Sequence, residues 1–441
     1  MQVPTRLATC STGGRLGLAG WLCLLSLTLM FVGGCGRNEE AERPVRQNVT
    51  LLHYFSFSGE FSGAMERLAE GFNRSVSAHT LTALPVDHES FKTSILEDLR
   101  RGNAAELYSY WAGARVRSIL EHLAPIDDTL PISELSRSFS PSVIQSAAMY
   151  NGHVYFLPLT QHFVGFFYNK KVFSAHGVTP PRTWDEFLRA VATLRRKGVV
   201  PVALGAKAKW PAQFWFDYLL LRTTSIEYRD RLLNGNASFT DPEVRRVFAL
   251  WRDLVRAGAF NANPNELEFD RGAAAMVHRG EAAMTLMGTW LIGYYAGPEY
   301  KWREGEDYGF FPFPDISPNI PRVALGPIDG LVMPKAAKNM QGAKAVLRNF
   351  ANVPAQEALS RATGALAPNL AVPDQAYSPL KQAVRNEIRQ CESWAFNFDL
   401  AAPPAIAETG LNLFAQFLEF PDQYPYLLEK AEARVRLLAR P

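Results

Sequence analysis

The alternation of strand-like and helix-like segments is the feature of this sequence that most limits its fold. Strand candidates and helix candidates follow one another in the order 49–55, 60–74, 79–86, 90–102 and 106–112. Because a helix that joins two parallel strands makes a right-handed crossover, this order predicts a mainly parallel sheet flanked by helices. Ligands bind at the carboxyl ends of the strands in such sheets, which is where Tyr54 and Trp111 fall.

A second alternating set follows the first and predicts a second lobe. It contains strand candidates and helix candidates at 162–169, 183–198, 200–205, 211–222, 242–257, 265–279, 282–286 and 322–333. Thr183 stands three residues before Glu186, the spacing of a capping box at a helix start. The rest of the chain is predicted to be mainly helical. Since 441 residues exceed what one compact core usually holds, the chain is predicted to be an α/β protein with two lobes.

The first 35 residues indicate export and lipid attachment. A basic region, the uncharged stretch 16–34 and small residues at its end are typical of a secretory signal. At 19 residues this stretch could also cross a bilayer as an uncleaved helix. The run "VGGC" resembles the lipobox of bacterial lipoproteins, which implies that 1–34 is removed and that Cys35 carries palmitate or another acyl chain. The polar stretch 35–47 is then a flexible tether between the membrane and the lobes.

Charge and cysteine content exclude other classes of protein. Without the two arginines of the signal, 44 basic residues face 43 acidic ones, so the charge balance gives no indication of a nucleic-acid partner. Cys10 and Cys23 lie in the signal and Cys35 would carry lipid, so Cys391 has no disulfide partner. We interpret Cys391 as a buried structural thiol, and we expect hydrophobic cores alone to hold the lobes together.

Three stretches resemble the signatures of a known family. The first is "FLPLTQHFVGFFYNKKVFSAHGVTPPRTWDEF" (156–187), the second is "GEAAMTLMGTW" (280–290), and the third is 331–369, a strand followed by two helices and a glycine near a proline. Together they resemble the extracellular solute-binding proteins of ABC importers, in the family-1 carbohydrate type related to maltodextrin-binding proteins. The resemblance covers essentially all of 48–370.

The resemblance implies two α/β lobes with a ligand cleft between them. Lobe 1 would comprise 48–158 and 325–370, and lobe 2 would comprise 163–320 and 371–441. It also implies a monomeric carrier in the periplasm or cell envelope, without a cofactor or metal. Such a carrier captures a sugar or oligosaccharide and delivers it to the permease subunits of the importer in the membrane.

Aromatic rings are the first candidates for the ligand site, because sugars present flat C–H faces to them. Trp290 matches the tryptophan of the family's Gly-x-Trp signature, whose ring stacks on a sugar, and Trp111 matches an aromatic-Trp-Ala segment that lines the cleft. Trp210 lies at a helix start where relatives often supply an aromatic ring. Core packing is the alternative for Trp290 and Trp111. Gly288 is expected to turn the chain before Trp290, and Thr289 to cap the helix that begins there.

Polar side chains complete the predicted site. His162 has the spacing from Pro158 at which relatives place a polar contact, and Gln161 stands beside it. Asp329 and Gly330 lie in a "GPIDG" segment that is expected to be a strand-end turn, where a glycine lets the backbone approach a ligand. The remaining candidates flank the first strand-helix turn or start a helix: Tyr54, Glu60 and Gln213. Exposed turn positions are the alternative for Tyr54 and Glu60.

Two other functions compete with sugar transport. The sequence contains no H-E-x-x-H, P-loop or G-x-S-x-G motif and no cysteine pairs at metal spacing. The carboxylate pair Asp127-Asp128 looks like part of a solvated turn, so a secreted glycosidase is disfavoured. The closer alternative keeps the fold and changes the ligand to a glycerophosphodiester, whose phosphate would require an arginine in the cleft.

Overall fold

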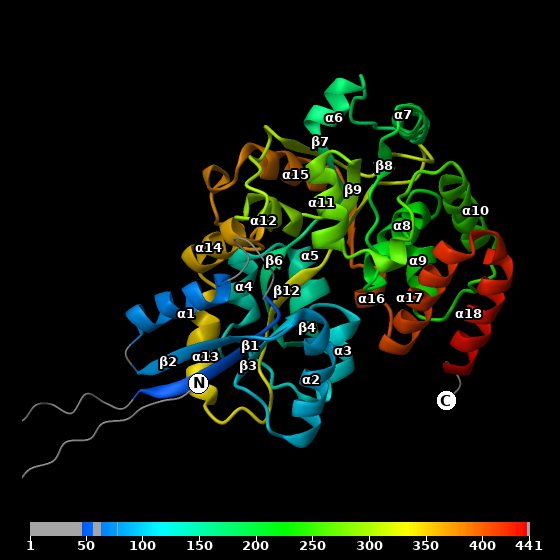
Figure 1. Ribbon diagram of the computed structural model, residues 1–441. Coiled ribbons are helices and arrows are strands. Elements are labelled where there is room, and N and C mark those ends of the chain that lie inside the picture. Colours follow the sequence, from blue (N-terminus) through cyan, green and yellow to red (C-terminus); the bar gives the residue numbers. More distant parts are fainter. Residues whose placement is uncertain (1–45, 56–62, 77, 439–441) are drawn as a thin grey trace, which may run out of the picture. The chain divides into compact units, whose positions relative to one another are not determined.

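The computed structural model describes residues 46–55, 63–76 and 78–438. These residues form two lobes, each built on its own sheet with helices packed around it (Figure 1). The predicted α/β fold with two lobes is therefore confirmed. Among the described residues, no helix is both long enough and apolar enough to cross a membrane. The expected signal, tether and Cys35 lie outside the described residues.

The first lobe is built on a five-stranded sheet with the order β2-β1-β3-β12-β6. Its strands are β1 (Gln47–His53), β2 (His79–Pro85), β3 (Leu107–Trp111), β6 (Phe156–Gln161) and β12 (Ile328–Val332). β1 is parallel to β2 and β3, whereas β12 is antiparallel to β3 and β6. The helices of this part are α1 (Ala64–Ser75), α2 (His88–Arg101), α3 (Ala114–Ile119), α4 (Ile132–Ser138) and α5 (Pro141–Val143). A small hairpin, β4 (Met149–Tyr150) and β5 (His153–Val154), precedes β6.

The second lobe is built on a four-stranded sheet with the order β10-β7-β9-β8. Its strands are β7 (Val164–Asn169), β8 (Val200–Val202), β9 (Ala282–Gly288) and β10 (Tyr308–Phe311). β8 and β9 pair in parallel, whereas β7 is antiparallel to both β9 and β10. The predicted mainly parallel direction therefore holds in both sheets, apart from the reversed strands β12 and β7. The strands that follow the crossings between lobes enter their sheets in the opposite direction and make both sheets mixed.

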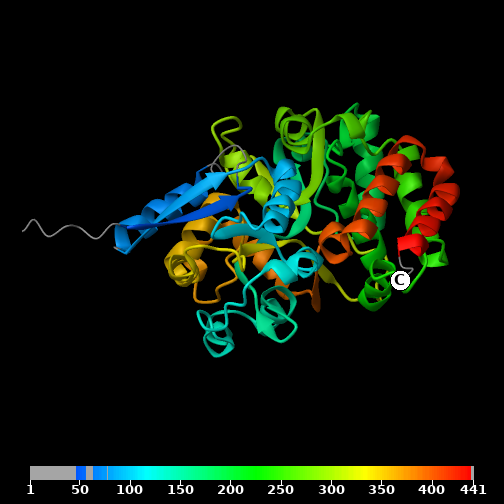
Figure 2. The ribbon, with the colours of Figure 1, turned by 90° about the horizontal axis from the view of Figure 1, so that it is seen from below.

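Helices surround the second sheet and form the end of the chain. They are α6 (Lys170–Ala175), α7 (Trp184–Arg196), α8 (Trp210–Leu221), α9 (Ile226–Leu233), α10 (Pro242–Arg256), α11 (Ala275–Arg279), α12 (Trp290–Ala296), α15 (Pro379–Arg389), α16 (Phe398–Ala401), α17 (Pro404–Glu419) and α18 (Tyr424–Leu438). The two helices between α12 and α15, α13 (Met340–Phe350) and α14 (Val353–Thr363), pack on the first lobe against β1 and α1. The capping box before α7 is confirmed, since Thr183 and Glu186 bond each other's backbone N–H. In Figure 2 the red α17 and α18 lie at the opposite end of the molecule from the blue β1 and β2.

Each lobe has its own hydrophobic core. One core combines buried side chains from Val49–Leu159 with others from Ile328–Ala362, and the second combines Val164–Leu325 with 380–435. We propose that the lobes divide the chain as the sequence predicted, because the two cores separate near those boundaries. Leu400 belongs to the first core and Phe398 to the second, so the segment 396–401, called the junction segment below, touches both lobes.

The structure differs from the predicted secondary structure near residues 322–333. The strand expected at 322–333 is two strands, because β11 (Val323–Leu325) pairs with β13 (Ser393–Ala395) while β12 joins the first sheet. Asp329 and Gly330 therefore lie inside a buried strand and not in a turn. Cys391 is half-buried, and its thiol donates to the backbone oxygen of Glu387 at 3.4 Å.

Candidate functional site

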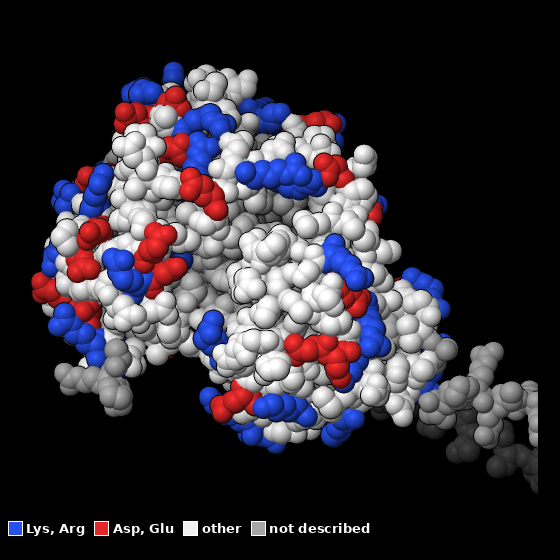
Figure 3. Space-filling model, turned by 180° about the vertical axis from the view of Figure 1, so that it is seen from behind, with Lys and Arg blue, Asp and Glu red and all other residues white. Residues whose placement is uncertain are grey.

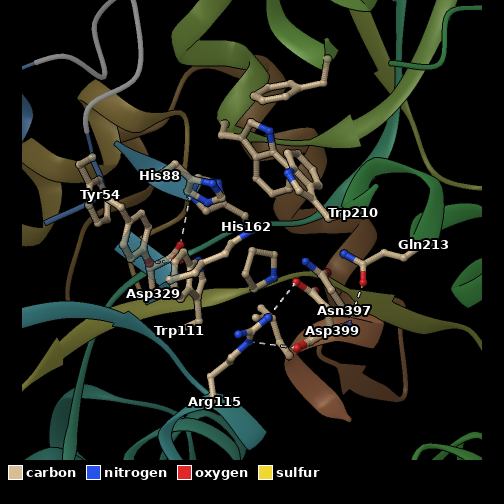
Figure 4. A pocket seen from close by; sticks show the side chains of 16 residues that line it. Tyr54, His88, Trp111, Arg115, His162, Trp210, Gln213, Asp329, Asn397 and Asp399 are labelled. Carbon is tan, nitrogen blue, oxygen red and sulfur yellow. Dashed lines mark hydrogen bonds and ion pairs between the residues drawn. The ribbon is translucent and has the colours of Figure 1, made fainter. Parts of the chain in front are cut away.

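A cavity lies where side chains from both lobes meet (Figure 4). Its volume of about 70 Å³ is several times what one water molecule needs, so a ligand would displace more than one water. The residues that line it come from strand ends, helix starts and the junction segment: Tyr54, Phe55, His88, Lys92, Trp111, Arg115, His162, Trp210, Gln213, Phe269, Trp290, Pro327, Asp329, Asn397, Asp399 and Leu400.

Most of the residues predicted from the sequence meet at this cavity. Those that line it are Tyr54, Trp111, His162, Trp210, Gln213, Trp290 and Asp329. Gln161 does not, because it faces a different cavity between β6 and the linker after α14. Gly330 does not either: a Cβ there would lie 2.0 Å from the backbone oxygen of Leu157, so this glycine serves the close approach of β12 to β6. Glu60 lies outside the described residues.

Two stacked rings form the wall on the first lobe. Tyr54 follows β1 and Trp111 ends β3, and their ring centroids are 4.0 Å apart with planes inclined by 13°. The carboxyl ends of these two parallel strands are adjacent, so the topology brings the rings together. Trp111 is only 6% exposed and belongs to the first core, so the same side chain packs the core and lines the cavity.

Aromatic side chains from three elements form the opposite wall. Trp210 begins α8 and Trp290 begins α12, and their centroids are 5.9 Å apart. Phe269 packs edge-on against Trp210 at 5.0 Å. Trp290 is partly buried and contacts both hydrophobic cores. It is therefore more embedded than a solvated cleft wall, and its removal should cost some stability as well as affinity.

The residues before Trp290 act differently from what the sequence suggested. Thr289 makes no side-chain cap, because its hydroxyl contacts Nδ1 of His162 at 3.0 Å and accepts from the backbone N–H of Phe163 at 3.3 Å. Gly288 is not in the left-handed region. A Cβ on Gly288 would lie 2.0 Å from Cζ3 of Trp290, so the missing side chain leaves room for the indole ring.

A hydrogen-bonded network surrounds Asp329 at the centre of the cavity. Its Oδ1 accepts from the Tyr54 hydroxyl at 2.6 Å and its Oδ2 accepts from Thr160 at 2.9 Å. Burial raises the pKa of Asp329 to about 6, although these two hydrogen bonds lower it. Burial and the Asp329 carboxylate raise the pKa of Tyr54, so its hydroxyl stays protonated and donates.

His162 is neutral and extends this network towards the second lobe. Burial, with the nearby Lys381 cation, lowers the pKa of His162 to about 3. Because Thr289 already accepts from a backbone N–H, its own proton can go to Nδ1, which leaves Nε2 of His162 protonated. That Nε2 lies 3.7 Å from Oδ2 of Asp329, so the two groups make a polar contact and not a pair of full charges.

Several residues that line the cavity were not predicted from the sequence. Asn397 and Asp399 belong to the junction segment, which returns to the cavity from the far end of the chain. Arg115 on α3 lies against Asp399, with Nε donating to its backbone oxygen at 3.3 Å. Nothing in the sequence "SWAFNFDLAA" distinguishes Asn397 and Asp399 from residues of a solvated loop. Their position at the cavity depends on the packing of the segment against α8 and α3.

The cationic side chains of the cavity are paired with carboxylates. Lys92 donates to both oxygens of Glu89 at 2.9 Å, and Nη2 of Arg115 lies 3.8 Å from Oδ2 of Asp399. Burial lowers the pKa of His88, which also lines the cavity and lies 6.4 Å from the Trp210 ring across the lobes. Figure 3 shows the molecule from the side opposite to that of Figure 1, and on this surface basic and acidic side chains are interspersed.

Comparison with known proteins identifies the family. The sequence profile of the bacterial extracellular solute-binding proteins matches residues 58–357, which is more than half of the chain. The chain therefore belongs to this family, and the resemblance seen in the sequence is confirmed. The members of this family bind solutes and are not enzymes.

Relatives and solved structures agree with this family. An ABC transporter extracellular-binding protein of Pyrococcus horikoshii is 28% identical over 357 residues, covering 79% of this chain and 77% of the relative. A probable sugar-binding periplasmic protein of Brucella melitensis is 23% identical, covering 84% and 87% of the two chains. The solved structure of the solute receptor AcbH, described as having an exclusive preference for β-D-galactopyranose, is 25% identical with a TM-score of 0.82, covering 90% and 100%.

Proposed function

We propose that this chain is the solute-binding component of an ABC importer and that it captures a neutral sugar in the cavity between its lobes. The observation that carries the proposal is the pair of aromatic walls, Tyr54 with Trp111 and Trp210 with Trp290, on opposite sides of a polar centre. Such walls suit the C–H faces of a sugar ring, while Asp329 and its neighbours suit the hydroxyl groups. The relatives named as sugar-binding proteins support the same ligand class.

The charges of the cavity favour a sugar over a glycerophosphodiester. A phosphate would require a cation that is free to bind it. Arg115 and Lys92, the cations that line the cavity, already face carboxylates. Asp329 and Asp399 would in addition repel an anion that entered the site.

A panel of ligands tests the proposal. The full-length chain, purified in detergent, is titrated by calorimetry with D-galactose, D-xylose, chitobiose, maltotriose, glycerol 3-phosphate and glycerophosphocholine. A ligand at about 100-fold excess over its Kd should stabilise the folded state by about 2.7 kcal/mol, which thermal unfolding measures independently. Saturable binding of a neutral sugar is expected. Tighter binding of a phosphate compound than of every sugar would refute the choice of ligand.

We also propose that the chain is anchored to the membrane by a lipid on Cys35 and that it works as a monomer beside the permease. The "VGGC" run supports this anchor. We propose no catalytic step: the ligand leaves unchanged. Release of reducing ends from the oligosaccharides of the panel would contradict that view.

A further inference from the structure

The backbone of the junction segment is fixed by a buried ion pair in the second lobe. Asp217 and Arg229 are 0% and 1% exposed, and their Oδ1 and Nη2 atoms are 2.6 Å apart. Arg229 also donates to the backbone oxygen of Phe396 at 2.7 Å, and Asp217 accepts from the backbone N–H of Phe398 at 2.8 Å. These bonds hold the segment at two points on either side of Asn397.

The next residue of the segment, Asp399, is held from both lobes. Its backbone N–H donates to Oε1 of Gln213 on α8 at 2.8 Å, and its backbone oxygen accepts from Nε of Arg115 on α3. The main chain at Asp399 therefore has its donor and its acceptor satisfied by the protein. Its side chain adds a 3.8 Å contact between Oδ2 and Nη2 of Arg115, which does not involve Oδ1.

Two side-chain oxygens of this segment are buried at the cavity. Asn397 and Asp399 are 5% and 6% exposed, and neither Oδ1 atom has a hydrogen-bond partner among the residues that the structure describes. Both side chains line the cavity, on the side that faces the stacked Tyr54 and Trp111 in Figure 4. A buried acceptor without a donor is costly, so native proteins rarely keep one that no ligand or water satisfies.

The chemistry of these groups defines what would satisfy them. A carboxylate oxygen only accepts, so Asp399 requires a donor from the ligand. An amide both accepts and donates, which matches a hydroxyl group that does the same. Ether, phosphodiester and carboxylate oxygens cannot donate, so they would leave Asp399 unsatisfied.

We propose that Asp399 and Asn397 bind hydroxyl groups on one edge of a neutral ligand, with the hydroxyl at Asp399 as the donor, and that this pair sets the specificity of the cavity. The inference rests on the proposed function, because it names the groups that recognise the sugar. Asp399 binds the ligand directly, whereas Gln213, Asp217 and Arg229 position the segment that presents it.

A cycle of protein and ligand changes tests the assignment. The probe is D-galactose or, if another neutral sugar of the panel binds more tightly, that sugar, together with its monodeoxy derivatives. Calorimetry is done on the full-length wild type and on Asp399→Asn, which keeps the shape of the side chain. Because a hydrogen bond to a charged group is worth about one to two factors of ten in affinity, one deoxy derivative should bind the wild type about 10- to 100-fold more weakly.

The same derivative should lose about tenfold less in Asp399→Asn, because the amide oxygen there accepts a neutral hydrogen bond that is weaker than the bond to a carboxylate. Asn397→Ala should show the same coupling with a different hydroxyl, and it carries the test if Asp399→Asn unfolds. Arg115→Gln breaks the contact between the lobes but keeps the Asp399 carboxylate. It should therefore weaken the binding of the parent sugar and of every deoxy derivative by the same factor. The charge-matched control is Asp253→Asn, an exposed carboxylate paired with Arg252 on α10, which should bind like the wild type.

Three results would overturn the inference. Binding of the parent sugar by Asp399→Asn within about threefold of the wild type would show that the charge of the carboxylate adds nothing to binding, which contradicts a charged hydrogen bond from the sugar. A uniform loss across all derivatives, like that of Arg115→Gln, would assign Asp399 to lobe contacts alone. A wild type that binds phosphate compounds and no neutral sugar would refute the proposed function and this inference with it.

Discussion

Alanine at Gly288 should weaken sugar binding by moving the Trp290 ring. An added Cβ would lie 2.0 Å from Cζ3 and 2.3 Å from Cε3 of the indole, far inside van der Waals contact, so the ring must shift by more than about 1 Å. The backbone of Gly288 is not in the left-handed region, so the substitution adds no backbone strain. The effect of Gly288→Ala on binding therefore comes from the indole.

The size of this effect follows from the contacts of the ring. Stacking on an aromatic ring is worth about 0.5–1.5 kcal/mol beyond the buried area, so losing it should weaken sugar binding by about tenfold. Overpacking at the same place should lower the free energy of unfolding by roughly 1–3 kcal/mol. Calorimetry with the neutral sugar and urea unfolding measure the two quantities on the same preparation.

Three variants separate this explanation from a general loss of stability. Gly288→Ala added to Trp290→Ala should change affinity little, because the ring that it displaces is absent. Gly71→Ala is the matched control: it lies in α1, where an added Cβ meets nothing closer than 4.0 Å, and should bind sugar normally. Trp251→Ala, in the second core, should cost about 3–5 kcal/mol of stability. Normal sugar affinity in Gly288→Ala, or full additivity with Trp290→Ala, would refute the reasoning.

The remaining predictions concern titration, closure and the anchor. The folded pKa of Asp329 is raised to about 6, so its contribution to stability is present in acid and is lost as the pH rises. The stability of the wild type relative to Asp329→Asn should fall by about 2 kcal/mol between pH 4 and 6.5. His162, with a folded pKa of about 3, acts in the opposite direction: the stability of the wild type relative to His162→Asn should fall by about 3 kcal/mol as the pH drops from 7 to 4. Urea unfolding at a series of pH values measures both effects. A free energy of unfolding that changes with pH equally in the wild type and the variants would contradict both predictions. Small-angle scattering should show a smaller radius of gyration when sugar saturates the wild type, and no change would count against a closing cleft. Cys35→Ser should abolish palmitate labelling in a bacterial host, whereas a wild type that takes up no label would disprove the anchor.

The sequence predicted those parts of the site that local pattern determines. Tyr54 and Trp111 follow from the strand alternation, because the carboxyl ends of adjacent parallel strands must meet. Trp290 follows from a signature in which the glycine and the tryptophan are two residues apart, so their contact is local. The predicted two-lobed fold rests on the same alternation.

The errors and omissions arise from contacts between distant segments. Gly330 looked like a turn residue, but β12 lies between β3 and β6, where the glycine allows close packing of strands. Thr289 looked like a helix cap, but His162, far away in sequence, takes its hydroxyl. No sequence pattern indicated that Asp399 belongs to the site, because only the fold brings it next to Arg115.

A crystal structure of the chain with the neutral sugar that binds most tightly tests the central claim most directly. We predict that the sugar lies between the lobes with one face of its ring against Trp290, and that one of its hydroxyl groups lies within about 3 Å of Oδ1 of Asp399. A sugar bound elsewhere, such as in the cavity beside Gln161, or an empty cavity between Trp111 and Trp290 at saturating sugar, would contradict the account.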